Sequence, residues 1–207
     1  MNPVCYLLVA TRNEGKLSEF QHLLSDLAFA LYSLRDFPAI RPIPETGRSF
    51  VENASLKAAG YATQAQLLTL ADDSGLELAE LGGAPGVFSA RYAGEFASDT
   101  ERIDKLLAEL VTTGAAERTA RFVSAVAIAG ADGNVLDVSL GICEGHIALA
   151  PRGSGGFGYD PVFIPNGYDL TFAELPAKIK NQISHRAQAP QGARQYLQNL
   201  TGGSGAG

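Results

Sequence analysis

The chain has 207 residues, of which 46% are hydrophobic and 18% charged, and its formal net charge is −6. This length suffices for one domain with a substantial buried core. The acidic balance argues against a general nucleic-acid-binding protein, because no basic surplus is present to neutralise a polymer backbone. No secretory signal and no apolar run of about 18 residues is present, so we expect neither secretion nor membrane spanning. Cys5 and Cys143 lie in apolar stretches and predict free thiols in a reducing environment.

The first element is the apolar run Val4–Ala10, which predicts a strand buried on both faces of an α/β sheet. A short polar loop with Gly15 and Lys16 follows, and then a helix with Leu17 and Phe20 among its apolar positions. A strand, a polar loop and a helix N-terminus in this order are typical of a phosphate-binding site. The spacing of a Walker loop is absent, and a plain β–α turn is the alternative from these residues alone.

A second helix is predicted after a short strand at 29–33 and a proline-containing loop at 38–44. Ser49 with Glu52 forms a capping box that opens this helix, which should run to about Gln64. Lys57 falls in the middle of its apolar stripe, with Asn53 one turn earlier. A lysine there either extends its ammonium to solvent or meets an anion, because an unpaired buried charge is costly. The stripe consists of Phe50, Ala54, Ala58 and Tyr61.

The most informative stretch follows this helix. The run Leu67–Ala71 predicts a short buried strand that ends at two adjacent carboxylates, Asp72 and Asp73, followed by Ser74 and by Gly75, which permits a sharp turn. Paired carboxylates at a strand end indicate a divalent metal held by oxygen. An ordinary polar turn is the alternative, because Asp, Ser and Gly are common turn residues.

The middle of the chain is interpreted as scaffold. Ser98 with Glu101 forms a second capping box, and the helix that it opens carries an apolar stripe. The segments 121–129 and 135–147 predict two core strands joined by a turn at 132–134. An arginine placed like Arg91 more often forms a structural ion pair than a substrate contact. The stripe of the helix consists of Ile103, Leu106, Leu107, Leu110 and Val111.

The C-terminal third contains a glycine-rich loop at 152–160 and the tripeptide Ser184-His185-Arg186. The glycines permit close backbone approach and the loop's two aromatic rings offer a stacking surface, so recognition of a base competes with a mobile surface loop as the interpretation. A Ser–His nucleophilic couple is unlikely, because neighbouring residues do not face each other on a helix. Pro190 predicts a kink or a restart of the last helix.

Taken in order, the motifs resemble the inosine triphosphate pyrophosphatase family, whose members hydrolyse deaminated purine nucleoside triphosphates. The resemblance covers about residues 4–200, and Arg12 stands where many relatives carry a small residue. The motifs are Thr-x-Asn-x-x-Lys at 11–16, Glu-Thr-Gly at 45–47, Glu-Asn-Ala with Lys57 at 52–57, Ala-Asp-Asp-Ser-Gly at 71–75, Gly-Val-Phe-Ser-Ala-Arg-Tyr at 86–92, Gly-Gly-Phe-Gly-Tyr-Asp-Pro at 155–161 and Ser-His-Arg at 184–186.

We therefore expect an α/β fold: an elongated mixed β-sheet flanked by helices, forming one domain over 1–200 with two lobes and a central active-site cleft, and a flexible tail at 201–207. The resemblance implies a cytoplasmic homodimer that acts on a small purine nucleoside triphosphate and binds neither a nucleic-acid polymer nor a membrane.

The resemblance also implies Mg²⁺-dependent hydrolysis of ITP, dITP and XTP to the monophosphate and pyrophosphate. Asp73 is the predicted general base or ligand of a metal-bound water, with Asp72 and Glu45 as supporting ligands; the sequence leaves open which of these two touches the metal directly. His185 and Arg186 are implied as hydrogen-bond donors to the purine. The full set of predicted substrate-binding residues is Thr11, Arg12, Asn13, Glu14, Gly15, Lys16, Asn53, Lys57, Ser74, Phe157, Gly158, Tyr159, Asp160, Lys180, His185 and Arg186.

Two alternatives compete with this interpretation. The related septum-formation-inhibitor family also cleaves nucleotides, but the Phe-Gly-Tyr-Asp and Ser-His-Arg segments favour the purine family. A nucleotide-binding sensor without turnover is the other alternative. The presence of Asp72, Asp73, Lys16 and Lys57 together argues against a sensor, which has no use for an activated water.

Overall fold

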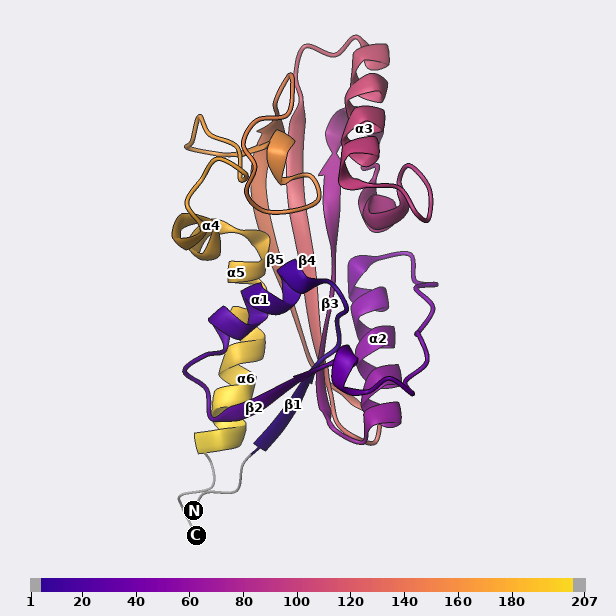
Figure 1. The fold of residues 1–207 in the computed structure, drawn as a ribbon, viewed down its shortest axis with the longest axis vertical. Coiled ribbons are helices and arrows are strands. Elements are labelled where there is room, and N and C mark those ends of the chain that lie inside the picture. The colour runs from indigo at the N-terminus through magenta and orange to yellow at the C-terminus, as the bar shows by residue number, and fades with distance from the viewer. Residues whose placement is uncertain (1–4, 203–207) are drawn as a thin grey trace. The chain divides into compact units, whose positions relative to one another are not determined.

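The computed structural model describes residues 5–202, and its six strands form one sheet in the order β2-β1-β3-β4-β5-β6 (Figure 1). Strand β1 is parallel to both β2 and β3, whereas β5 and β6 are antiparallel, so the predicted mixed α/β sheet is confirmed. The strands are β1 (Cys5–Val9), β2 (Phe29–Ser33), β3 (Leu68–Leu78), β4 (Thr119–Ala129), β5 (Val135–Ile147) and β6 (Phe163–Pro165). The α-helices are α1 (Glu14–Leu23), α2 (Phe50–Ala65), α3 (Asp99–Thr113), α4 (Ala177–Ile183), α5 (His185–Gln188) and α6 (Pro190–Gly202).

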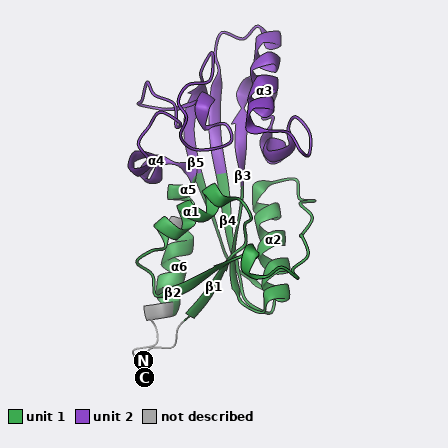
Figure 2. Ribbon diagram, viewed as in Figure 1, with its two compact units in different colours: residues 1–73, 124–141, 186–207 green, residues 74–123, 142–185 purple. Residues whose placement is uncertain are grey.

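The chain divides into two compact units (Figure 2). Among the described residues, unit 1 comprises 5–73, 124–141 and 186–202, and unit 2 comprises 74–123 and 142–185. Strands β3, β4 and β5 contribute residues to both units. The single domain with a central cleft stays a prediction. Most of the predicted tail at 201–207 lies outside the described residues, and α6 includes its first two positions.

In unit 1, successive side chains of β1 and β3 point to opposite faces of the sheet. Leu7 and Val9 pack with Leu70 of β3 in a core cluster that also includes Phe20 of α1 and Leu197 of α6. The side chain between the first two, Leu8, is also fully buried but points the other way, since successive side chains of a strand face opposite sides. Figure 1 shows α1 and α6 on one side of these strands and α2 on the other. Both faces are therefore covered, as expected for a buried α/β sheet.

Unit 2 has its own core around an aromatic group. Phe122 of β4 lies 4.6 Å from Phe163 and 6.0 Å from Phe172, measured between ring centroids. The same cluster includes Leu76 at the end of β3 and Leu106 of α3. This core joins the end of β3 to the segment that follows the glycine-rich loop.

Several predicted boundaries are confirmed. Strand β2 has the predicted bounds, and Ser49 caps α2 by accepting a hydrogen bond from the Glu52 amide at 3.2 Å. The capping box of Ser98 and Glu101 opens α3. Helix α6 begins at Pro190, because a proline is tolerated in the first turn of a helix.

The predicted end of the central strand at Ala71 is wrong. Strand β3 continues to Leu78, so Asp72 and Asp73 lie within it. Gly75 serves close approach instead of a turn: a Cβ there would lie 2.4 Å from Ser89 Oγ and 2.6 Å from the Gly86 carbonyl oxygen. A glycine at position 75 therefore has a structural reason, but the reason is the close packing of the 3-10 helix Gly86–Arg91 on the strand and not a turn.

The prediction that β5 belongs wholly to the sheet core is also wrong. Its residues alternate in burial, and Val138 and Leu140 are 39% and 55% exposed. On α3, Val111 is 70% exposed, because it lies beyond the buried stripe of Ile103, Leu106 and Leu110. Within residues 5–202 we find no helix with the length and hydropathy needed to span a membrane.

The two faces of α3 supply a test of the core. Leu106→Ala should lower the free energy of unfolding by about 2–5 kcal/mol, because it opens a cavity in a fully buried site. Val111→Ala, on the exposed face of the same helix, should change it by less than about 0.5 kcal/mol. Chemical denaturation of both variants measures the difference. Equal losses would contradict the assignment of the core to the Leu106 face.

Candidate active site

The two adjacent carboxylates of β3 point to opposite faces of the strand. Asp72 contacts Lys16 of α1, on the side of Leu70, and Asp73 contacts Lys57 of α2. This divergence follows from the extended backbone, which alternates side chains between the two faces of a sheet. Both residues are more than nine-tenths buried. The predicted pair therefore forms two separate clusters within unit 1.

The Asp72 cluster surrounds one carboxylate with donors. Its Oδ2 lies 2.6 Å from Lys16 Nζ and 3.8 Å from Arg186 Nε, and its Oδ1 accepts a 2.5 Å hydrogen bond from Ser124 Oγ of β4. Burial disfavours the charged carboxylate, but Lys16 and Arg186 outweigh that effect and hold the pKa of Asp72 well below its ordinary value. Burial also lowers the pKa of Lys16, although Asp72 opposes the change. Asp72 is therefore ionised at neutral pH.

The loop at 11–16 positions Lys16 in the first turn of α1. Asn13 is the N-cap, and its Oδ1 accepts a hydrogen bond from the Lys16 amide at 3.0 Å. Thr11 Oγ1 accepts one from the Asn13 amide at 3.1 Å. Glu14 pairs with Arg35 at the surface, and Arg12 donates to the Ile40 carbonyl oxygen at 3.4 Å. These hydrogen bonds order the backbone of the loop at Lys16. Contact of Lys16 with phosphate stays a prediction.

Arg186 is buried between two carboxylates. Its Nη1 lies 2.8 Å from Glu19 Oε2 on α1, in addition to the longer approach to Asp72. The guanidinium thus belongs to the Asp72 cluster of unit 1. Its implied hydrogen bond to a purine stays a prediction.

The Asp73 cluster is centred on the ammonium group of Lys57. Lys57 Nζ lies 2.8 Å from Asp73 Oδ1 and 2.9 Å from Glu45 Oε1. Asn53 Nδ2 donates to Asp73 Oδ2 at 3.2 Å, while Asn53 Oδ1 accepts from the Gly47 amide at 2.8 Å. Of the two alternatives for Lys57, pairing with an anion is therefore the observed one. Asn53 also fixes the loop that leads into α2.

The electrostatics of this cluster favour a carboxylate that can take a proton. Burial raises the pKa of Asp73, and the Lys57 ammonium opposes that rise only in part. Burial disfavours the ammonium of Lys57, but Asp73 and Glu45 outweigh it and raise the pKa of Lys57. Lys57 therefore stays charged, and Asp73 is the more basic of the two adjacent aspartates.

The carboxylate oxygens around Lys57 fit a hard divalent cation as ligands. Glu45 and Asp73 approach one positive charge from two elements, and Mg²⁺ typically takes one or two carboxylates together with substrate phosphates. Among residues 5–202, no group of three His, Cys, Asp or Glu side chains is close enough to hold a metal ion. Asp72 points to the other face of β3, so Glu45 and Asp73 are the carboxylates that fit such an ion best.

In unit 2 the glycine-rich loop is closed by a buried ion pair. Lys180 Nζ lies 2.6 Å from Asp160 Oδ2 and 4.7 Å from the centroid of the Phe157 ring. The same carboxylate oxygen accepts a hydrogen bond from the Phe157 amide at 2.8 Å. Gly156, at φ +72°, passes so close that a Cβ would lie 2.0 Å from Asp160 Oδ2. The loop is thus a braced structure that presents an aromatic ring beside a lysine.

His185 completes this group. Its ring stacks on Phe122 with 4.6 Å between centroids and 13° between planes. Ser184 is the C-cap of α4, and α5 begins at His185. The predicted tripeptide is therefore divided between the units: Ser184 and His185 belong to unit 2 and Arg186 to unit 1. Ser74, at intermediate burial, is the first residue of unit 2 on β3.

Sequence reasoning missed two residues of the Asp72 cluster. Ser124 is the one hydroxyl residue in the otherwise apolar run 122–129, and that exception was the available signal. Glu19 follows Lys16 at the i+3 spacing, which places both on one face of α1. Ser124 was overlooked because its strand was interpreted as core, and Glu19 because attention fell on the loop that precedes its helix.

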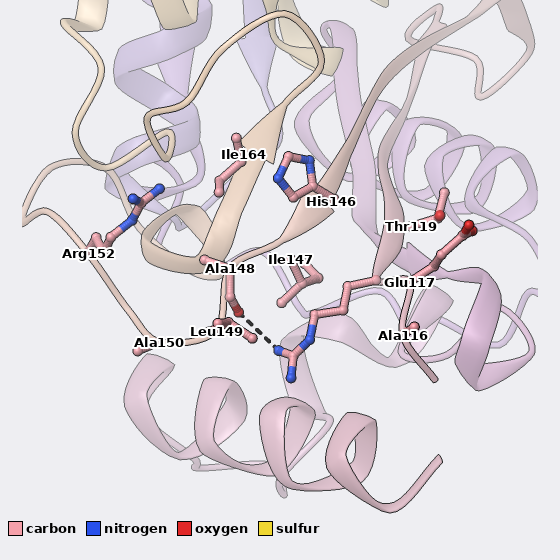
Figure 3. A pocket seen from close by; sticks show the side chains of 11 residues that line it. Ala116, Glu117, Thr119, His146, Ile147, Ala148, Leu149, Ala150, Arg152 and Ile164 are labelled. Carbon is pink, nitrogen blue, oxygen red and sulfur yellow. Dashed lines mark hydrogen bonds between the residues drawn. The ribbon is translucent and has the colours of Figure 1, made fainter. Parts of the chain in front are cut away.

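A pocket of about 640 Å³ lies elsewhere in unit 2 (Figure 3). Arg118, one of the residues that line it, donates to the Ala148 carbonyl oxygen at 3.2 Å. It contains none of the predicted site residues and has no part in the site proposed below. Its lining consists of Ala116, Glu117, Arg118, Thr119, His146, Ile147, Ala148, Leu149, Ala150, Arg152 and Ile164.

Fold and clusters together define the class: an α/β protein with buried lysine–carboxylate pairs on both faces of a central strand. The Ham1 family model matches residues 7–196. The chain is 48% identical over 182 residues to the dITP/XTP pyrophosphatase of Halalkalibacterium halodurans, covering 88% of this chain and 93% of that protein. It is 46% identical over 194 residues to the dITP/XTP pyrophosphatase of Shouchella clausii, covering 94% and 97%. The solved structure of a HAM1 protein from Coxiella burnetii superposes with a TM-score of 0.85 at 43% identity, covering 96% of this chain and 100% of that one. The chain belongs to the Ham1 family, which confirms the resemblance derived from its motifs.

The Lys57 cluster predicts a specific cost of removing one charge. Lys57→Met should lower the free energy of unfolding by about 3–5 kcal/mol, because it leaves Asp73 and Glu45 without their shared cation. Lys178→Met is the matched control: this lysine is exposed on α4, and its loss should cost less than about 0.5 kcal/mol. Urea denaturation of both variants measures the two losses in the free energy of unfolding. A loss at Lys57 no larger than at Lys178 would contradict the described cluster.

Proposed function

We propose that this protein is a nucleoside triphosphate pyrophosphohydrolase that converts ITP, dITP and XTP to the monophosphate and pyrophosphate. The observation that carries the proposal is the buried cluster in which Lys57 joins Asp73 to Glu45. Membership of the Ham1 family and the activity for which the relatives are named, dITP/XTP pyrophosphatase, support the choice of substrates.

In this proposal, the chain's own groups bind phosphate and move one proton. Lys16, which is partly buried, and Lys57, which is buried, each pair with a carboxylate in unit 1 and supply positive charge for the triphosphate. Asp73 accepts a proton from the attacking water, a role favoured by the raised pKa of its carboxylate. The products require that the anhydride bond between the α and β phosphates breaks and that pyrophosphate leaves. Asp72, which stays ionised, keeps Lys16 in place.

Mg²⁺ is part of the proposal. Glu45 and Asp73 would hold it, since both are oxygen ligands that already converge on one cation. When bound, Mg²⁺ stabilises the negative charge that develops on the phosphates. Lys57 then has fewer carboxylate charges to neutralise and is available to the substrate.

Recognition of the purine base is assigned to residues of unit 2. Phe157 offers a ring for stacking, Lys180 beside it is a predicted substrate contact, and His185 is a predicted donor for the C6 oxygen that hypoxanthine and xanthine share. Gly158, Tyr159 and the carboxylate of Asp160 complete the braced loop. Their assignment as substrate contacts rests on the motif resemblance.

We also propose a cytoplasmic homodimer. Cys143, a buried thiol outside any disulfide, supports a reducing compartment. Exposed apolar side chains on the unit 1 part of β5, including Val138 and Leu140, support a surface that a second copy would cover. Sedimentation of the purified protein as a monomer at micromolar concentration would remove the dimer from the proposal.

The reaction itself is tested by product identity. With ITP and Mg²⁺, phosphorus NMR should show pyrophosphate and IMP as initial products, and chelation of the metal should stop the reaction. Initial formation of IDP and orthophosphate would overturn the proposed bond cleavage. Binding of ITP without any product would instead indicate a nucleotide sensor.

Asp73 supplies the sharpest mutational test. Asp73→Asn keeps the shape of the side chain but removes the charge that takes a proton or holds metal. We expect kcat for ITP to fall by roughly 10²–10⁴, with the fold retained by circular dichroism. Asp104→Asn, at an exposed position of α3, is the control and should keep full activity. Turnover close to that of the unmodified protein in Asp73→Asn would exclude Asp73 from the mechanism.

A further inference from the structure

The glycine-rich loop is tied to α3 by one side chain. Asp99 Oδ2, on the first residue of α3, accepts a 2.7 Å hydrogen bond from the amide of Gly158, which is 59 residues further along the chain. Gly158 adopts φ +62°, a left-handed conformation that glycine tolerates. The amide is the middle one of the segment Phe157-Gly158-Tyr159. A single carboxylate therefore holds the centre of the loop from outside it.

The two neighbours of Gly158 are anchored separately. The Phe157 amide donates to Asp160 within the loop, and the Tyr159 hydroxyl donates to the Ser89 carbonyl oxygen at 3.0 Å. The bond to Asp160 is local and moves with the loop. Asp99 and Ser89 lie outside the loop, as does Lys180, which pairs with Asp160; Asp99 is the one of these three that binds the Gly158 amide. Its removal would take the acceptor away from that amide.

Asp99 is itself held in a fixed orientation. Ser98 and Glu101 form the capping box that starts α3 at this residue. The other oxygen, Oδ1, pairs with the Arg102 guanidinium one turn later. Arg102 also donates to the carbonyl oxygens of Ala90 and Ala97, at 2.6 and 2.9 Å. The side chain is thus preorganised to accept from Gly158, which lowers the conformational entropy lost in forming the bond.

We propose that Asp99 is a positioning residue for recognition of the nucleobase. Through the Gly158 amide it sets the orientation of the peptide that carries the Phe157 ring beside Lys180. The inference rests on the proposed function, which assigns this loop to the base. It extends that function to a residue that touches no substrate and lies in a helix interpreted from the sequence as scaffold.

Kinetics separate positioning of the base from general damage. In Asp99→Ala, KM for ITP should rise about tenfold with little change in kcat, as expected for the loss of one hydrogen bond to a charged group. Inhibition by inorganic triphosphate, which has no base, should keep its inhibition constant. Asp99→Asn keeps one acceptor oxygen for two donors, the Gly158 amide and Arg102, so its rise in KM should be no larger than that of Asp99→Ala. Asp104→Ala, exposed on the same helix, is the matched control.

Amide hydrogen exchange gives a readout that does not depend on activity. Peptides covering 155–160 should exchange faster in Asp99→Ala than in Asp104→Ala, while peptides from the α3 interior should not. An unchanged KM for ITP, or an equal weakening of ITP and inorganic triphosphate, would overturn the positioning role. If the unmodified protein does not hydrolyse ITP, the proposed function fails first, and faster exchange at 155–160 would still establish the anchor.

Discussion

Two carboxylates are buried next to each other in the middle of a strand, and much of unit 1 follows from how they are compensated. The extended backbone of β3 sends Asp72 and Asp73 to opposite faces. A buried carboxylate without a partner costs several kcal/mol, so each face must deliver a cation. Helix α1 supplies Lys16 on one side and α2 supplies Lys57 on the other. The positions of both helices on the sheet thus have an electrostatic reason in addition to an apolar one.

The two clusters are not equivalent, and their difference bears on chemistry. Asp72 is surrounded by Lys16, Arg186 and a hydroxyl, which hold its pKa low and make it a permanent anion. Asp73 shares one ammonium group with Glu45, and burial raises its pKa. A permanent anion suits the fixing of a lysine, whereas a carboxylate with a raised pKa suits acceptance of a proton. Adjacent residues of the same type are therefore assigned different roles by their surroundings.

In unit 2, the main structural requirement is to hold the irregular glycine-rich loop in one conformation. Glycines at positive φ allow the chain to turn tightly but supply no side chain to pack. The loop gains its order from the buried pair of Lys180 and Asp160, and from Asp99 and Ser89 outside it. A helix whose apolar stripe indicates only scaffold thus also carries a polar contact to the loop proposed to meet the base. Packing and recognition are served by different faces of the same element.

Local periodicity, capping residues and ordered motifs are enough to predict the mixed α/β fold, the bounds of β2, the start points of α2, α3 and α6, and the family. They also single out Lys57 as a charge in an apolar stripe. The folded chain is needed to see that Lys57 meets Asp73 and Glu45 and that β3 runs on through Asp72 and Asp73. It is also needed to see that Ser124 and Glu19 join the Asp72 cluster and that Asp99 binds the glycine-rich loop. These contacts join residues that are remote in sequence or lie on elements that local patterns mark as scaffold. Their geometry is set by the pairing and packing of whole elements, which no local pattern encodes.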